Sequence, residues 1–149
     1  MPKAKSLAGR IAIVTGGAGG IGSATARRFL EQGACVVLAD IDKDMLAKTA
    51  DALMAEYSGD VVRTVLMNVT DEAAVDQSYA DMAVEFGGVD IVVSNAGIAS
   101  SAPVEETTLE LWNKNMSILS TGYFLVSRAA FKMLRVQNIG GAIIFIASK

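Results

Sequence analysis

Five short, continuous apolar runs alternate along this chain with longer amphipathic segments. The runs are the expected strands, at 11–14, 35–39, 61–67, 89–94 and 142–147. The segments between them have helical spacing and are the expected helices, at about 21–32, 43–57, 71–86 and 108–136. We expect Asp71 and Thr108 to cap the last two helices and Gly87-Gly88 to end the third. Strands separated by helices pair in parallel, and unbroken apolar strands need helices on both faces of their sheet. The sequence therefore predicts an α/β fold, a doubly wound parallel sheet with five strands in the order 3-2-1-4-5.

The composition fits one folded domain. The chain has 149 residues, of which 52% are hydrophobic and 19% charged, enough to bury a core. We expect residues 1–9 to be an N-terminal extension and residues 10–149 to form the domain. A net charge of −3 argues against nucleic acid or an anionic membrane as partner. No apolar run approaches the ~18 residues of a membrane span, so no membrane is expected either.

The absence of histidine and the presence of a single cysteine exclude several kinds of catalytic and metal site. The chain has no histidine, which excludes a Ser-His-Asp triad and any histidine-liganded metal, and we expect no metal site. Its one cysteine, Cys35, cannot form an internal disulfide. A reducing, cytoplasmic location is therefore expected.

A glycine-rich loop follows the first expected strand and opens the first expected helix. It reads Thr15-Gly16-Gly17-Ala18-Gly19-Gly20-Ile21-Gly22, which matches Gly-x-Gly-x-x-Gly in one register and Thr-Gly-x-x-x-Gly-x-Gly in another. At that place a pyrophosphate can bind unpaired N–H groups at the positive end of a helix. The pattern predicts a Rossmann-type dinucleotide site, and the alternative is a tight turn that binds no ligand.

Asp40 ends the second expected strand, 18 residues after Gly22. An acid at about this distance accepts hydrogen bonds from the adenosine ribose and repels a 2′-phosphate. No basic residue lies in the loop or directly after Asp40, and Lys43 is the nearest, so NAD is favoured over NADP. The alternative interpretation, in which Asp40 is an ordinary solvated acid at the end of a strand, stays open. S-adenosylmethionine is a rival ligand, although its loops usually begin with an acid where this chain has Thr15.

Three segments together resemble the short-chain dehydrogenase/reductase family: the glycine loop, Asn68-Val69-Thr70 and Asn95-Ala96-Gly97. The resemblance implies that the second segment contacts adenine, where the family usually has Asp-Val. Asparagine there keeps an acceptor oxygen and loses a charge. The third segment would line the cofactor. The cofactor-binding residues implied are Gly16, Ala18, Gly19, Gly20, Ile21, Gly22, Asp40, Ile41, Asn68, Val69, Asn95, Ala96 and Gly97.

The same resemblance implies a reaction. Ser148 aligns with the catalytic serine, whose hydroxyl would hold the oxygen of a small alcohol or carbonyl substrate. The proton would pass through a tyrosine with a lysine four residues further on, while hydride moves to or from nicotinamide.

Two positions depart from the family pattern. The tyrosines Tyr57, Tyr79 and Tyr123 are followed four residues later by Val61, Ala83 and Ser127, so the 149 residues hold no Tyr-x-x-x-Lys. We therefore expect a chain truncated before its sixth strand and inactive by itself. Leu119 stands three residues before Gly122, where the family often has a catalytic asparagine; Asn113 and Asn115 are nearby but out of register.

Other segments resemble one branch of the family. These are Leu111-Trp112, residues 127–131 and the ending Ile146-Ala147-Ser148-Lys149. They are similar to the dehydrogenase module fused to rhamnulose-phosphate aldolases, which would imply a small hydroxyaldehyde such as lactaldehyde as substrate. A non-catalytic nucleotide-binding or assembly module is the alternative function.

The long expected helix carries an apolar stripe that we expect to face the sheet: Met116, Leu119, Tyr123, Val126, Ala130 and Met133. Further apolar residues lie outside the stripe, among them Leu125 and Ala129. A homo-oligomer formed through helix 108–136, or through the open edge of the fifth strand, is expected from the resemblance and from edge pairing. The alternative is a core helix that contacts chain absent from this sequence.

Overall fold

The computed structural model describes residues 5–147, which form a parallel five-stranded sheet in the order β3-β2-β1-β4-β5. The strands are β1 (Ile11–Thr15), β2 (Cys35–Asp40), β3 (Val62–Leu66), β4 (Ile91–Ser94) and β5 (Ala142–Phe145). The predicted fold class and strand order are confirmed. β3, β4 and β5 are each shorter than the expected apolar runs, although residues next to them, such as Met67 and Ile146, still donate backbone hydrogen bonds to the neighbouring strands.

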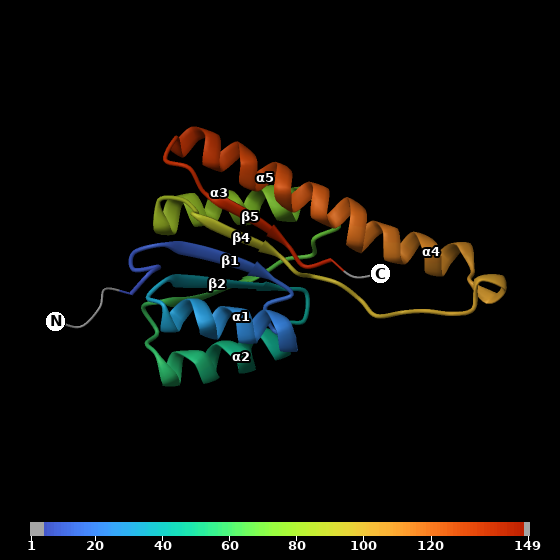
Figure 1. The fold of residues 1–149 in the computed structure, drawn as a ribbon, viewed down its shortest axis with the longest axis horizontal. Helices are drawn as coiled ribbons and strands as arrows, with labels where there is room; N and C mark the ends of the chain where they lie inside the picture. Colours follow the sequence, from blue (N-terminus) through green and yellow to red (C-terminus); the bar gives the residue numbers. More distant parts are fainter. Residues whose placement is uncertain (1–4, 148–149) are drawn as a thin grey trace.

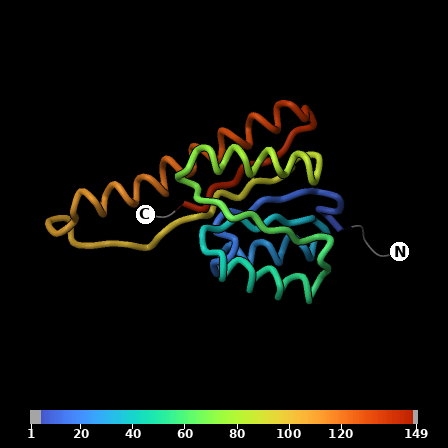
Figure 2. The backbone as a smooth tube through the Cα atoms, turned by 180° about the vertical axis from the view of Figure 1, so that it is seen from behind, coloured from blue at the N-terminus to red at the C-terminus, as the bar shows by residue number. Residues whose placement is uncertain are grey.

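Helices cover both faces of the sheet, as the apolar strands require (Figures 1 and 2). On one face lie α1 (Gly20–Glu31) and α2 (Lys43–Glu56), and on the other lie α3 (Glu72–Phe86) and α5 (Tyr123–Gln137). Alternate strand residues supply the two cores. Ile13 and Val92 pack with α3 and α5, whereas Val14 and Val93 pack with α1 and α2, and all four are fully or almost fully buried.

Local signals place most helix ends. The side chains of Asp71 and Thr108 accept hydrogen bonds from the N–H groups of Ala74 and Leu111, both at 3.1 Å, and cap α3 and the last long helix as predicted. Gly87 ends α3 in a left-handed conformation with φ of 78°. The last helix was expected to end at about residue 136. It ends at Gln137, within one residue of the predicted end, and the following Asn138 adopts the left-handed conformation with φ of 52°, which asparagine tolerates.

The predicted single helix 108–136 consists of three segments in one continuous rod. These are α4 (Leu109–Met116), a π-helical segment η2 (Ser117–Gly122) and α5. The loop before it contains a short 3-10 turn, η1 (Val104–Glu106). Residues 98–116, called the arm below, project beyond the end of the sheet (Figure 1).

Because the arm projects, only part of the predicted apolar stripe is buried against the sheet. Val126 and Ala130 are fully buried against the sheet as expected, but Met116 and Leu119 are 42% and 38% exposed. At this end the rod extends past the sheet (Figure 1), and it borders the loop after β4, where Leu119 lies close to Gly97. Within α5 the buried surface is wider than predicted, since it also includes Leu125 and Ala129.

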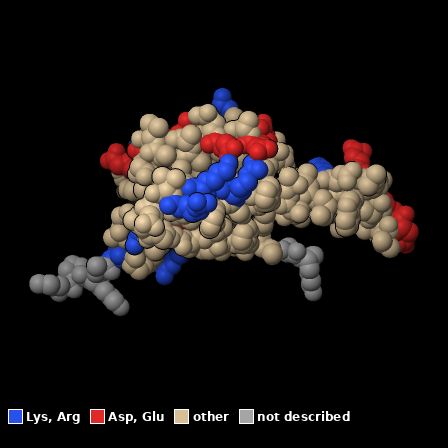
Figure 3. Space-filling model, turned by 90° about the horizontal axis from the view of Figure 1, so that it is seen from above, with Lys and Arg blue, Asp and Glu red and all other residues tan. Residues whose placement is uncertain are grey.

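Charged side chains join the two helices of one face. Arg128 of α5 pairs with Glu72 of α3, and Lys132 of α5 lies 3.8 Å from Asp76 of α3. The view onto this face shows basic and acidic groups side by side over the body of the molecule, whereas most of the projecting arm is uncharged (Figure 3). Such exposed pairs contribute little stability each, so the apolar core carries the fold.

Two tyrosines, Tyr79 in the core and the half-buried Tyr123, test how a hydrogen-bond partner changes the contribution of a hydroxyl group to stability. Burial raises the pKa of the Tyr79 hydroxyl, which has no hydrogen-bond partner among residues 5–147. The Tyr123 hydroxyl donates to the carbonyl oxygen of Ile146 at 2.6 Å. In urea denaturation we expect Tyr79→Phe to keep or raise the free energy of unfolding, and Tyr123→Phe to lower it by about 1 kcal/mol. A larger loss in Tyr79→Phe than in Tyr123→Phe would contradict this account.

Candidate functional site

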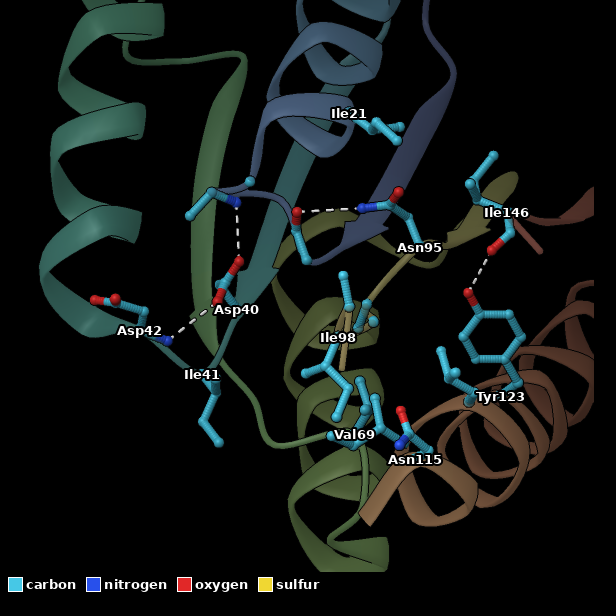
Figure 4. A pocket seen from close by; sticks show the side chains of 18 of the residues that line it. Ile21, Asp40, Ile41, Asp42, Val69, Asn95, Ile98, Asn115, Tyr123 and Ile146 are labelled. Carbon is cyan, nitrogen blue, oxygen red and sulfur yellow. Dashed lines mark hydrogen bonds between the residues drawn. The ribbon is translucent and has the colours of Figure 1, made fainter. Parts of the chain in front are cut away.

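A cleft of about 1230 Å³ lies beyond the carboxyl ends of the strands. Twelve residues predicted for the site line it: Gly16, Ala18, Gly19, Gly20, Ile21, Asp40, Ile41, Asn68, Val69, Asn95, Ala96 and Gly97. Figure 4 shows how part of this set converges from several elements. Gly22 does not line the cleft, because it lies behind the loop against Gly16, and Ser148 is outside the described residues.

The glycine loop is tied to both neighbouring strands. From the loop, the N–H of Gly17 donates to the carbonyl of Ala39 at 3.0 Å. From Asn95, directly after β4, the side-chain amide donates to the carbonyl of Thr15 at 2.9 Å. It also donates to the carbonyl of Gly16 at 3.2 Å (Figure 4). The Thr15 hydroxyl accepts the N–H groups of Asn95 and Ala96 at 2.9 and 3.0 Å. β1 and β4 are therefore locked together where the cleft opens.

Close packing explains two of the glycines. Gly16 has φ of 63°, and a Cβ there would stand 2.9 Å from the Cα of Ala96. A Cβ at Gly22 would overlap the carbonyl oxygen of Gly16, because α1 packs directly against the loop. Gly20 is different, since a Cβ there would meet nothing within 4 Å.

The amino end of α1 faces the cleft without a side-chain cap. Its cap residue, Gly19, makes no side-chain hydrogen bond, and no acidic residue occupies the first turn. Gly19, Gly20 and Ile21 all line the cleft. The N–H groups of this turn and the positive end of the helix are thus available to an anion, and the small residues admit one as bulky as a pyrophosphate.

Asp40 connects the glycine loop to the start of α2. One carboxylate oxygen accepts the N–H of Ala18 at 3.0 Å, and the other accepts the N–H of Asp42 at 3.1 Å (Figure 4). A carboxylate has about four acceptor positions, so two remain for ligand hydroxyl groups. Asp40 therefore shapes the loop and still presents acceptors to the cleft.

The described lining contains anionic groups and no cation. Its titratable residues are Asp40, Asp42 and Tyr123. Burial raises the pKa of Tyr123, and its hydroxyl is already hydrogen-bonded to Ile146, so nothing prepares it to move a proton at neutral pH. Among residues 5–147, no group of three histidine, cysteine or carboxylate side chains is arranged to hold a metal ion.

No helix in that part of the chain is long and apolar enough to cross a membrane.

The structure adds lining residues that sequence patterns did not assign. Tyr123 reaches the cleft from the start of α5, and its ring stacks on Phe145 with centroids 5.9 Å apart. Ser100 donates to the side-chain oxygen of Asn115 at 3.1 Å, joining the loop after β4 to α4. Leu119, which stands where a catalytic asparagine was considered, also lines the cleft. Tyr123 and Leu119 carried a sequence signal, their place in the apolar stripe, and that signal indicated core.

Comparison with known proteins agrees with this geometry. A family model described as short chain dehydrogenase matches residues 10–149. The chain belongs to this family, whose members are oxidoreductases that use a nicotinamide cofactor.

Several relatives can be compared in detail. The chain is 45% identical over 148 residues to the uncharacterized oxidoreductase YuxG of Bacillus subtilis, covering 99% of the chain and 22% of that protein. It is 39% identical to an NADP-dependent (R)-specific alcohol dehydrogenase of Lentilactobacillus kefiri, covering 95% of the chain and 55% of the relative. A crystal structure of NAD⁺-bound xylitol dehydrogenase superposes with a TM-score of 0.91 at 32% identity, covering 97% of the chain and 55% of that one. The chain thus spans about half the length of two of these proteins and about a fifth of the first.

Two glycines test the packing of the loop. We expect Gly22→Ala to lower the free energy of unfolding by about 1–3 kcal/mol, because the new methyl group forces α1 away from Gly16. Gly20→Ala is the matched control and should leave stability unchanged, since its Cβ projects into open space. Urea denaturation without nucleotide measures both. Equal stability of the two variants would refute the close contact.

Proposed function

We propose that this chain is the NAD-binding part of a short-chain alcohol dehydrogenase or reductase. Bound nicotinamide supplies hydride transfer to or from a small alcohol or carbonyl substrate. The observation that carries the proposal is one connected hydrogen-bond network. It joins the end of β1 and the glycine loop to Asp40 and Asn95, and it lies at one side of a single cleft. Membership of the family supports it. A cytoplasmic location, expected from the single cysteine, is part of the same proposal.

The preference for NAD over NADP rests on this chain's own residues, because its relatives include a protein named as NADP-dependent and one solved with NAD⁺. Asp40 would accept the ribose hydroxyls with its remaining acceptor positions. Asp42 lies beside it in the lining, and no basic side chain is among the described lining residues. A 2′-phosphate would enter a region of negative charge, so NADP would bind more weakly.

The catalytic part of the proposal concerns Ser148. By its place in the family it would hold the substrate oxygen. The sequence of 149 residues contains no Tyr-x-x-x-Lys, and the raised pKa of Tyr123 gives no substitute. The chain alone would bind NAD without turning over alcohols. The alternative, a non-catalytic nucleotide-binding module, would have the same cleft and no catalytic partner for Ser148 in any longer form of the protein.

The substrate part of the proposal is a small hydroxyaldehyde. It rests on the resemblance of Leu111-Trp112 and residues 127–131 to a dehydrogenase module fused to a sugar-phosphate aldolase. The Bacillus subtilis relative supports a module of this kind, since the chain covers only 22% of that protein.

Cofactor binding gives the direct test. In a thermal-shift comparison we expect NAD to raise the melting temperature more than NADP, and S-adenosylmethionine not to raise it. Calorimetric titration should show that Asp40→Ala weakens NAD binding by about tenfold or more, through lost hydrogen bonds to the ribose and to the loop. Asp51→Ala, an exposed change on α2 outside the cleft, is the control. A shift only with S-adenosylmethionine would replace the proposal with methyl transfer.

We further propose that the chain forms a homo-oligomer through its long helix. Three apolar side chains of the arm support this: Leu109, Trp112 and Met116 are 72%, 56% and 42% exposed. The other candidate surface is the outer edge of β5, which pairs with no strand among residues 5–147 and carries Ile144 and Phe145, 41% and 50% exposed.

Sedimentation distinguishes the two surfaces. We expect an oligomer in the wild-type chain and a shift to monomer in Trp112→Glu, because a buried unpaired charge opposes the interface. Val84→Glu is the control, since Val84 is also apolar and is 89% exposed on α3. An oligomer that survives Trp112→Glu would assign the interface to the β5 edge, and a wild-type monomer at high concentration would reject both.

A further inference from the structure

The base end of the cleft carries a feature that bears on which nucleotide it selects. The inference rests on the proposed function. With the pyrophosphate at the loop and the ribose at Asp40, the base extends away from the loop, past the end of β2. The lining there consists of Ile41, Asp42, Met45, Met67, Asn68 and Val69. Asn68 is the one neutral side chain in this set with polar atoms, and it is exposed to the cleft.

The Asn68 amide has a determined orientation. Its side-chain oxygen accepts the backbone N–H of Thr70 at 3.0 Å and the Thr70 hydroxyl at 2.9 Å. A backbone N–H can only donate, so the atom that faces it must be the amide oxygen rather than the nitrogen. The turn that follows is held by a further bond, from the N–H of Asp71 to the Asn68 carbonyl at 3.0 Å. The oxygen is therefore committed to the turn.

The amide nitrogen is the atom left for a ligand. It has no acceptor among residues 5–147, and it carries two N–H donors and no lone pair. An aspartate in the same turn would use one oxygen for Thr70 and offer the second as an acceptor. Asparagine keeps the acceptor oxygen expected from the sequence, but that oxygen is used within the turn.

The two side chains suit different bases. Adenine carries a 6-amino group, which donates hydrogen bonds and needs an acceptor opposite it. Hypoxanthine carries a 6-oxo group, which accepts hydrogen bonds and suits a donor. We infer that Asn68 presents a donor to the base, so that this site does not select for the adenine amino group and takes hypoxanthine as well as adenine dinucleotides.

Calorimetric titration with NAD and with nicotinamide hypoxanthine dinucleotide tests the inference. For the wild-type chain we expect the two dissociation constants to agree within about threefold. In Asn68→Asp the ratio should move by about tenfold or more in favour of NAD, because the carboxylate accepts from the amino group and repels the oxo group. Asn113→Asp, the same change at an exposed position of α4 outside the cleft, should leave the ratio unchanged.

The possible outcomes distinguish a failure of this inference from a failure of the proposed function on which it rests. NAD binding with a wild-type preference of tenfold or more over the hypoxanthine dinucleotide would overturn the inference and leave the proposed function standing. An unchanged ratio in Asn68→Asp would also overturn it. Failure of both dinucleotides to bind the wild-type chain would overturn the proposed function, and the inference with it.

Discussion

The junction between Thr15 and Asn95 is the contact on which the cleft depends. Two neighbouring parallel strands end here, and each satisfies polar groups of the other: the Thr15 hydroxyl accepts two N–H groups, and the Asn95 amide donates to two carbonyls. Backbone groups leaving a buried sheet need such partners. Because the junction is satisfied by side chains, the loop after β1 turns sharply into α1, and the amino end of that helix opens onto the cleft.

Asp40 extends the same network to the next strand. Its carboxylate holds Ala18 of the loop and Asp42 before α2, so the acid proposed to select the cofactor also shapes the surface that would bind the pyrophosphate. At Asn68 the side-chain oxygen is used within the local turn, and the amide nitrogen is the atom that remains for a ligand. In both cases, hydrogen bonds within the protein determine which atoms remain for recognition.

Local patterns predicted the body of the molecule well. The apolar strands, the caps Asp71 and Thr108, and the glycine at position 87 are short-range features, and each produced the expected element. The prediction failed for Met116 and Leu119, because helical periodicity shows which residues share a face but not where the sheet beneath them ends.

The sequence by itself determined the class of fold and the strand order, because apolar spacing is encoded locally. Twelve of the residues that line the cleft were also identified from the sequence, some from the glycine pattern and Asp40, and the others through the resemblance to the family. Only the tertiary structure decided what those residues do to one another. The overlap of Gly22 with Gly16, the Tyr123 bond to Ile146 and the orientation of the Asn68 amide each depend on atoms brought together by folding. Hydrogen-bond geometry, rather than residue type, therefore separates atoms that hold the fold from atoms free to bind.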